Sequence, residues 1–287
     1  MLRRIISALI VMAMAISIVI VDYMPLYIAA ICAMAVVAVY EVLVATKYIR
    51  NKILSAVSLF FVAMIPVIFV VDRLRENLPL LCSLFLFLLF IVMIYKHEKV
   101  SFAAVTLVGF VAILIPLSLS CLLFIRYFEP LREHGIFLMV FTLTVTFLGD
   151  SGAYFVGTFL GKHKMAPKIS PKKSWEGFVG GLITAGLAGF AAPYVYEFCH
   201  VHLMGRGILD FNPWLFAAAA VVCAALGVVG DFSASLVKRQ CAVKDFGNIM
   251  PGHGGVLDRM DSVLFAAPFM YQFLHYVSPI APVPIIV

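Results

Sequence analysis

The sequence predicts an all-α integral membrane protein, a polytopic helical bundle of about nine transmembrane helices. Its mean hydropathy is +1.08, only 13% of its 287 residues are charged, and long apolar runs recur along the chain. Soluble domains carry about 25% charged residues. A mostly apolar stretch of about 18 residues or more is typical of a transmembrane helix. Together these observations exclude an ordinary soluble protein.

Nine apolar runs are the predicted spans, namely 5–21, 25–44, 53–71, 79–95, 103–125, 136–160, 178–196, 214–230 and 262–277. Because 79–95 is short and 136–160 is interrupted, eight or ten spans remain open. Arg3 and Arg4 precede the first run, but no small-residue cleavage site follows, which favours a retained signal anchor. The six cysteines form no C-x-x-C pair, and this predicts neither a disulfide framework nor a zinc site.

The positions of the basic residues predict an orientation. With the N-terminus inside, the inward segments are 1–4, 45–52, 96–101, 161–177 and 231–261, and they hold sixteen of the 21 Lys and Arg residues. This excess satisfies the positive-inside rule. The two most basic loops, 161–177 and 231–261, are therefore expected to face the cytoplasm, where nucleotides and anionic lipid headgroups are found.

The distribution of polar residues and glycines divides the chain into two predicted domains. Residues 1–135 read as scaffold helices with lipid-facing packing, and their one intramembrane acid is Glu41, near a helix end. Residues 136–287 form the predicted catalytic transmembrane domain with cytoplasmic loops 161–177 and 231–261. Its glycines include the pairs 157/161 and 177/181, whose spacing favours close helix packing.

Two polar features mark the first half of this second domain. Asp150 interrupts an apolar run. A carboxylate in hydrocarbon is costly unless it meets a cation, a metal or water, so a proton relay, a metal ligand and a structural partner for a buried Lys all remain open. The segment "KMAPKISPKKSWEG", 164–177, carries four Lys, with Ser174 placed to cap the next helix. It reads either as a positive-inside anchor or as a clamp for polyanionic phosphate.

Two further features follow the 214–230 run. In "GDFSASLVKR", Asp231, Ser235 and Lys238 would share one face of a helix, which reads as a solvated helix end or as a polar site. "PGHGG", 251–255, is a Pro/Gly turn whose N–H groups could bind an anion. Asp258 and Asp261 come next, at i and i+3 on one expected helix face. Two facing carboxylates need a cation between them, and Mg²⁺ takes one or two protein carboxylates and completes its shell with water and phosphates.

These features meet the needs of nucleotidyl transfer from a soluble nucleoside triphosphate to a membrane lipid. Such a reaction needs a divalent cation on the triphosphate, cations for the leaving pyrophosphate, and in-line alignment of the attacking oxygen. Carboxylates at the membrane edge beside basic loops supply these groups. No Walker A motif, G-x-G-x-x-G fingerprint or kinase signature is present.

The run "SLVKRQCAVKDFGNIMPGHGGVLDRMD", 235–261, resembles the signature of the phosphatidate cytidylyltransferase (CDP-diacylglycerol synthase) family. The matching positions are Ser235, Lys238, Arg239, Lys244, Asp245, Pro251, His253, Gly254, Gly255, Asp258, Arg259 and Asp261. The upstream run "GDSGAYFVGTFLGKHKMAPKISPKKSWEG" is similar to the family's second block, although Thr is usual there where this chain has Ser174. The resemblance covers about 149–262, and the N-terminal spans agree only in number and hydrophobicity.

The resemblance implies the reaction CTP + phosphatidate → CDP-diacylglycerol + pyrophosphate, with Mg²⁺ and no covalent enzyme intermediate. It also implies a second, monovalent cation such as K⁺, a homodimer, and a multi-pass location in the inner (cytoplasmic) membrane with the active-site loops facing the cytoplasm. CTP, phosphatidate and the lipid bilayer are the expected partners, and no nucleic acid is expected.

The family resemblance implies a role for each matching residue of this sequence. Asp231 and Asp258 are the expected metal ligands, with Asp261 as the third acid of the metal site. The expected triphosphate ligands are Lys238, Arg239 and Lys244, and His253 shapes the phosphate turn; all seven count as catalytic. The expected substrate-binding residues are Lys172, Lys173, Ser174, Ser235, Asp245, Gly254, Gly255, Arg259 and Asp150, with Asp150 organising the Lys residues or the second cation.

Two rival functions remain. An ion-coupled transporter would explain Asp150 but not the charged 235–261 loop. Another CTP-using lipid enzyme, such as a polyprenol kinase or an archaeal-lipid cytidylyltransferase, would share the headgroup chemistry. The complete signature and the nine-span length favour the phosphatidate enzyme.

Overall fold

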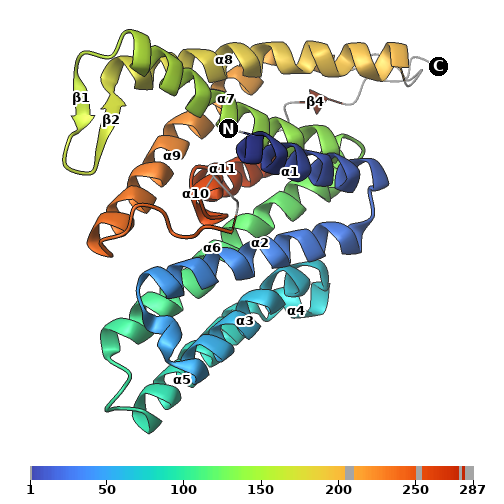
Figure 1. The fold of residues 1–287 in the computed structure, drawn as a ribbon. Helices are drawn as coiled ribbons and strands as arrows, with labels where there is room; N and C mark the ends of the chain where they lie inside the picture. Colours follow the sequence, from blue (N-terminus) through green and yellow to red (C-terminus); the bar gives the residue numbers. More distant parts are fainter. Residues whose placement is uncertain (1, 204–209, 250–253, 278–279, 282–287) are drawn as a thin grey trace. The chain divides into compact units, whose positions relative to one another are not determined.

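The structure of the protein is a computed structural model that describes residues 2–203, 210–249, 254–277 and 280–281 (Figure 1). Its long helices are α1 (Leu2–Val21), α2 (Met24–Ala45), α3 (Lys52–Val70), α5 (Leu78–Tyr95), α6 (Phe102–Arg126), α7 (Gly135–Phe159), α8 (Trp175–Phe198), α9 (Pro213–Gln240) and α11 (Val263–Tyr276). The shorter ones are α4 (Asp72–Glu76), α10 (Leu257–Met260), η1 (Tyr48–Arg50), η2 (Glu129–His134) and η3 (Cys199–Leu203).

Among the described residues, strands occur in two small antiparallel pairs. β1 (Lys164–Ala166) pairs with β2 (Ser170–Ser174), and β3 (Asp210–Phe211) pairs with β4 (Ile280–Ala281). Helices therefore make up most of the described chain, which confirms the predicted all-α class.

Each of the nine predicted apolar runs coincides with a described helix, but not all of these helices span a membrane by length and composition. Six do so among the residues that the structure describes: Met24–Ala45, Leu78–Tyr95, Phe102–Arg126, Glu129–Phe159, Trp175–His202 and Pro213–Gln240. Among the residues whose side chains the structure describes, the apolar stretches Met12–Val21 of α1 and Lys52–Ile68 of α3 are shorter, and α11 has 14 residues. The protein is thus a multi-pass membrane protein, while the count of nine spans stays a prediction.

The chain forms two compact units, each described by itself. Unit 1 comprises residues 1–123 and 237–260, and unit 2 comprises 124–236 and 261–287. The last turn of α9 belongs to unit 1 and the rest of that helix to unit 2. The predicted division at residue 135 rests on the distribution of polar residues and glycines, whereas these units are defined by compactness. The predicted division therefore stays a prediction.

Unit 1 is organised around α2. This helix packs on α3, α3 packs on α5, and α10 returns from far along the chain to contact α2. Val39, Glu41 and Leu43 of α2 are almost completely buried, and the rings of Phe61 and Phe85 stack with centroids 3.9 Å apart. Because lipid tails are as apolar as Leu, packing of this kind rather than the hydrophobic effect holds helices together inside a membrane.

Unit 2 is organised around the pairing of α7 with α8. A Cβ atom added at Gly177 would lie 2.7 Å from the carbonyl oxygen of Ala153 and 3.0 Å from the Cα of Gly157. The backbones of the two helices therefore approach so closely that only glycine fits at this crossing. This contact confirms close helix packing for the 177/181 pair and for Gly157, whereas Gly161 lies beyond the end of α7 and takes no part in the crossing.

The segment between α7 and α8 is a β-hairpin rather than an unstructured loop. β1 and β2 pair from Lys164↔Ser174 to Ala166↔Ser170. Glu176, in the first turn of α8, accepts hydrogen bonds from the N–H groups of Lys162 and His163 and thereby holds the base of the hairpin. The Ser174 hydroxyl accepts the N–H of Gly177 at 3.2 Å, so the predicted cap of this helix is confirmed.

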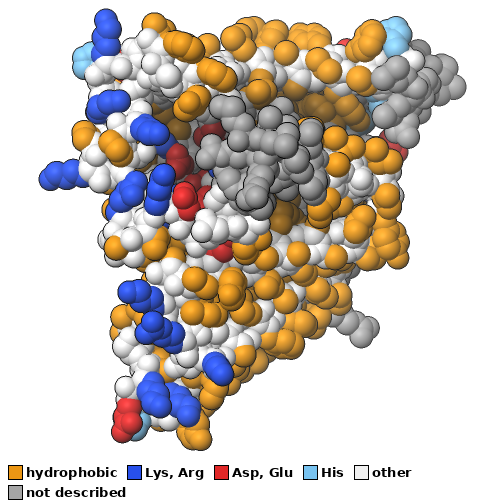
Figure 2. Space-filling view, viewed as in Figure 1, with side chains coloured by type: hydrophobic (Ala, Val, Ile, Leu, Met, Phe, Trp, Pro, Cys, Tyr) orange, Lys and Arg blue, Asp and Glu red, His pale blue; other side chains and the backbone are white. Residues whose placement is uncertain are grey.

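The visible surface is largely apolar, as lipid-facing helices require, and Lys and Arg side chains gather in groups on it (Figure 2). Exposed large apolar side chains include Phe60 at 71% exposure in unit 1 and Phe159 at 80% in unit 2. A soluble protein would rarely leave so many large apolar side chains in water.

Candidate active site

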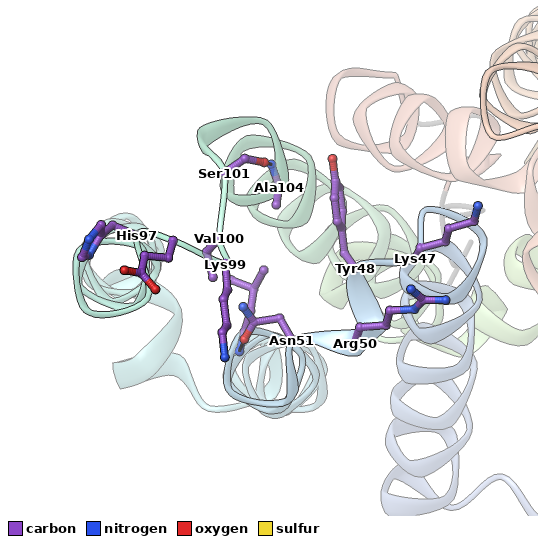
Figure 3. Close-up of a pocket in the computed structure, with 11 residues that line it drawn as sticks. Lys47, Tyr48, Arg50, Asn51, His97, Lys99, Val100, Ser101 and Ala104 are labelled. Carbon is purple, nitrogen blue, oxygen red and sulfur yellow. Dashed lines mark hydrogen bonds between the residues drawn. The ribbon is translucent and has the colours of Figure 1, made fainter.

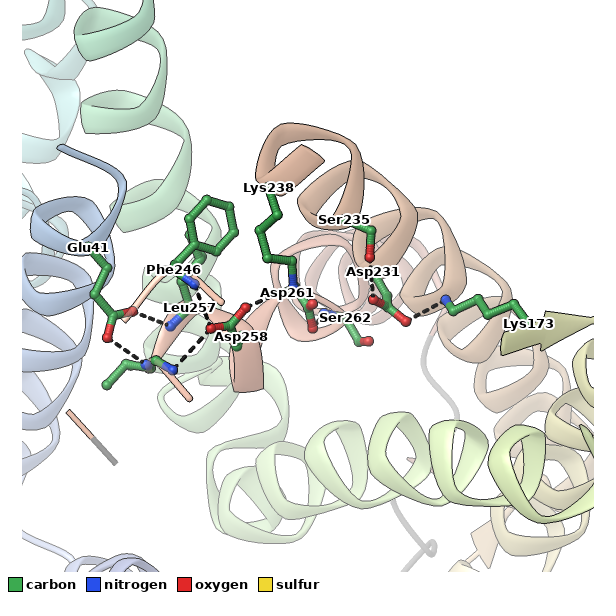
Figure 4. A network of polar contacts seen from close by, with 12 residues as sticks. Glu41, Lys173, Asp231, Ser235, Lys238, Phe246, Leu257, Asp258, Asp261 and Ser262 are labelled. Carbon is green, nitrogen blue, oxygen red and sulfur yellow. Dashed lines mark hydrogen bonds and ion pairs between the residues drawn. The ribbon is translucent and has the colours of Figure 1, made fainter. Parts of the chain in front are cut away.

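Helix α9 carries the first polar cluster, which lies in unit 2 (Figure 4). Asp231 and Ser235 are one turn apart, and the Ser235 hydroxyl donates to Asp231 Oδ1 at 3.3 Å. Lys173 Nζ lies 2.5 Å from the other oxygen, Asp231 Oδ2, and 4.4 Å from the centroid of the Phe232 ring. The ammonium group makes no hydrogen bond of standard geometry in the described structure, so the ion pair is its main polar contact.

Strand β2 separates two lysines that are adjacent in the sequence. Successive side chains of a strand point to opposite faces. Lys172 is exposed, whereas Lys173 is partly buried against Asp231. The predicted pair of phosphate-binding lysines is therefore split into one solvent-facing lysine and one that holds an acid.

Asp150 belongs to the same cluster. Its Oδ2 accepts a hydrogen bond from the Ser262 hydroxyl at 2.8 Å, and the Ser262 N–H donates to Asp261 Oδ1 at 2.9 Å. Asp150 also lies close enough to Asp231 and Lys173 for their charges to interact. We call Asp150, Asp231 and Asp261, with Lys173, Ser235 and Ser262, the unit 2 cluster. It collects carboxylates from α7, α9 and the turn between α10 and α11.

Asp258 is the centre of a second polar cluster, in unit 1. Its Oδ1 accepts a hydrogen bond from Lys238 Nζ at 2.8 Å. The two side chains are only 12% (Lys238) and 6% (Asp258) exposed. Replacing one partner of a buried ion pair strongly destabilises a protein, because the charge of the other partner is left uncompensated.

The second oxygen of Asp258 organises the surrounding loop. Asp258 Oδ2 accepts the N–H of Phe246 at 2.9 Å and the N–H of Gly255 at 3.0 Å. Gly254, beside it, has φ +86°, a left-handed backbone that favours glycine. The predicted role of these glycines in shaping a tight turn is thus consistent with the backbone at residue 254, while Pro251 and His253 lie outside the described residues.

Glu41 is a site contact that the sequence does not predict. The sequence predicts scaffold and lipid-facing packing for residues 1–135, but Glu41 is only 2% exposed. Its Oε1 accepts the N–H of Val256 and its Oε2 accepts the N–H of Leu257, both at 3.0 Å (Figure 4). An acid in an apolar run needs such partners, and this need was the signal in the sequence. We call Glu41, Lys238 and Asp258, with residues 246–249 and 254–257, the unit 1 cluster.

The helix face expected for Asp258 and Asp261 is wrong. Asp258 lies in α10 (Leu257–Met260), whereas Asp261 lies in the turn after that helix. Asp261 accepts the N–H of its own neighbour, Ser262. Local side-chain-to-backbone bonds of this kind compete with helix continuation. The helical placement of Asp231, Ser235 and Lys238 is confirmed, since α9 is continuous through all three.

Several other predicted ligands have side chains exposed to solvent. Five of these side chains are exposed: Lys172, Arg239, Lys244, Asp245 and Arg259. Exposed cations are accessible to a soluble polyanion. Lys173 and Lys238 are less exposed, and each is paired with a carboxylate.

The predicted metal ligands fit a hard cation by donor type. All are carboxylates, and Mg²⁺ needs only one or two of them. Among the described residues, no group of three or more His, Cys, Asp or Glu is arranged to hold a metal ion, and Asp231 and Asp258 are each paired with a lysine. A lysine ammonium is the cation that compensates each acid here.

A separate basic cavity of about 360 Å³ lies in unit 1, between the α2–α3 and α5–α6 connections (Figure 3). Lys47, Arg50, His97 and Lys99 line it, together with Glu98. None of the predicted site residues is among its described lining residues. Its basic residues fall in 45–52 and 96–101, so the positive-inside bias accounts for them.

Comparison with known proteins identifies the family to which this chain belongs. The chain belongs to the cytidylyltransferase family, whose sequence profile matches residues 2–277. A phosphatidate cytidylyltransferase of Haemophilus influenzae is 41% identical over 177 residues, which cover 61% of this chain and 57% of that protein. A phosphatidate cytidylyltransferase of Staphylococcus haemolyticus is 38% identical over 144 residues, 50% of this chain and 51% of that protein. The matches thus span about half the length of these curated relatives.

Proposed function

We propose that this chain is a membrane-embedded phosphatidate cytidylyltransferase, which converts CTP and phosphatidate into CDP-diacylglycerol and pyrophosphate. The observation that carries the proposal is the 235–261 signature loop, whose buried Asp258 binds Lys238 and two backbone N–H groups. The names of the relatives support phosphatidate as the lipid substrate.

The proposed reaction is an in-line displacement. An oxygen of the phosphatidate phosphate attacks the α-phosphorus of CTP, the bond from this phosphorus to the bridging oxygen of the β-phosphate breaks, and pyrophosphate leaves. The second ionisation of a phosphate monoester has a pKa of about 6. The nucleophile is therefore mostly ionised at neutral pH, and catalysis depends on charge compensation and alignment rather than on a strong base.

The chain's own residues would provide that compensation. Arg239 and Lys244 are exposed and are the residues we assign to first contact with the triphosphate. Lys238 and Lys173 are the second pair, since each is held near an acid that a cation could take over. Lys172 and Arg259, both exposed, are assigned to the phosphatidate phosphate or the β,γ-phosphates.

We assign Mg²⁺ to Asp231, Asp258 and Asp261 on donor chemistry and family resemblance. When bound, it would neutralise the triphosphate and the leaving pyrophosphate. Asp150 is assigned to organising Lys173 or to a second, monovalent cation such as K⁺. The proposed location is the inner membrane, with loops 161–177 and 231–261 on the cytoplasmic side, in a homodimer. These last assignments rest on the basic-residue bias and the family resemblance.

The first experiment measures CTP- and Mg²⁺-dependent formation of CDP-diacylglycerol by the detergent-purified protein, with the Asp258→Asn variant alongside. We expect turnover by the wild type and a loss of more than about 100-fold in the variant, because changing even the outer-shell partners of a metal site costs about 10–100-fold. Glu129→Gln is the matched control, since Glu129 pairs with Arg132 on an exposed surface. It should retain full activity.

Three results would overturn parts of the proposal. Equal activity of a folded Asp258→Asn variant would remove this residue from the site. CTP binding without turnover of phosphatidate would indicate another lipid acceptor, such as a polyprenol. No CTP binding at all would reject the enzyme and revive the transporter.

A further inference from the structure

The strongest unassigned feature is the contact between Glu41 and the signature loop, which deepens the proposed function and rests on it. Glu41 lies in α2 and its partners lie more than 200 residues later, at 256 and 257. Both carboxylate oxygens are used, one for each N–H group. No side chain of the loop is needed for this contact, so the carboxylate binds the backbone itself.

The loop is shaped to fit this carboxylate. A Cβ atom added at Gly247 would lie 2.4 Å from Glu41 Oε1, and one added at Gly255 would lie 2.4 Å from Oε2. Two glycines therefore flank the acid from opposite ends of the loop. The φ angle of neither lies in the left-handed region, so close approach rather than backbone strain requires glycine at these positions.

The two bonded N–H groups stand at the start of α10. The first N–H groups of a helix have no partner within it, and Glu41 supplies acceptors for two of them from another helix. Asp258 is the next residue, and its own oxygens hold Gly255, Phe246 and Lys238. Fixing the backbone at 256–257 therefore fixes the direction of the Asp258 carboxylate.

We propose that Glu41 is a positioning residue for catalysis. It holds the start of α10 so that the Asp258 carboxylate is oriented to bind Mg²⁺. Groups that orient a metal ligand contribute to metal affinity and activity without touching the metal. Both the carboxylate and its backbone partners are buried, so water cannot replace the lost bonds at low cost.

The test replaces Glu41 by Gln, which has the same shape but presents an NH₂ group to one of the two backbone N–H groups. We expect kcat to fall about 10–100-fold and the Mg²⁺ concentration for half-maximal activity to rise by a similar factor, with little change in KM for phosphatidate. Glu41→Asp keeps both acceptor oxygens and should recover part of the loss. Gly247→Ala disturbs the same contact from the loop side and should shift the Mg²⁺ dependence in the same direction.

Leu89→Ala is the matched control for general destabilisation. Leu89 is fully buried in α5 of the same unit, and its truncation should lower the melting temperature without moving the Mg²⁺ dependence. If Glu41→Gln and Gly247→Ala lower activity only as far as Leu89→Ala does, with the Mg²⁺ dependence unchanged, Glu41 is a structural residue and the proposal is wrong.

Hydrogen–deuterium exchange gives a readout that needs no turnover. The amides of Val256 and Leu257 should exchange at least about ten-fold faster in Glu41→Gln than in the wild type, because Glu41 supplies their acceptors. The Leu89→Ala protein should show no selective change there. Unchanged exchange in Glu41→Gln would overturn the proposal. A wild type that protects these amides but lacks cytidylyltransferase activity would instead reject only the proposed function.

Discussion

Lys172 and Lys173 show that the position of a residue along a strand decides whether its side chain is exposed or paired. The sequence treats the two as equivalent cations, but the alternation of β2 exposes one and pairs the other with Asp231. Chemical identity is therefore a poor guide to role when a strand separates neighbours.

We predict that Lys173→Met destabilises the protein by about 1–3 kcal/mol. Removing one partner of a fully buried ion pair costs about 3–5 kcal/mol. Here the side chains are 22% (Lys173) and 33% (Asp231) exposed, so solvent screens part of the charge left on Asp231. Thermal unfolding in detergent measures the change, and Lys172→Met, which alters an exposed side chain, should be nearly neutral. Equal destabilisation by the two variants would contradict the pairing.

At the scale of helices, glycines of α8 differ in what surrounds them, since Gly177 faces the backbone of α7 and Gly186 faces a side chain of α9. At Gly177 an added Cβ meets backbone atoms of α7, at Ala153 and Gly157. At Gly186, in the same helix, it meets the end of the Val221 side chain at 3.0 Å. A side chain can rotate away, whereas a helix backbone cannot.

We predict that Gly177→Ala destabilises unit 2 by about 1–3 kcal/mol, the usual cost of overpacking, while Gly186→Ala is close to neutral. Alanine favours a helix by about 1 kcal/mol over glycine, which offsets the milder contact at Gly186. Unfolding midpoints of the two variants in the same detergent provide the comparison. A Gly177→Ala variant that unfolds at the same midpoint as the wild type would contradict the close crossing of α7 and α8.

On the scale of the whole molecule, the orientation in the membrane follows from the basic residues. Sixteen of the 21 Lys and Arg residues fall in segments predicted to face the cytoplasm. This bias predicts that the 161–177 and 231–261 loops face the side where CTP is available. The proposed transfer reaction requires that orientation, because CTP is a soluble cytoplasmic nucleotide while the acceptor is a membrane lipid.

We predict that Lys168→Cys, in a background without the native cysteines, reacts with a membrane-impermeant thiol reagent only when the cytoplasmic side is accessible. Arg132→Cys, in a segment predicted to face outward, should show the opposite pattern. Labelling of intact cells and of inverted vesicles makes the comparison. Labelling of Lys168→Cys from outside would reverse the topology and remove the loops from their nucleotide.

The sequence by itself determined the membrane class, the positions of the apolar helices, the Ser174 cap and the signature acids of the candidate site. These properties are local: hydropathy, helix caps and motif spacing depend on residues near one another in the chain. Only the tertiary structure assigned Lys173 to Asp231, Lys238 to Asp258 and Glu41 to the backbone at 256–257. The last contact joins an acid to N–H groups that every residue except proline possesses, so no pattern in the sequence identifies its partner.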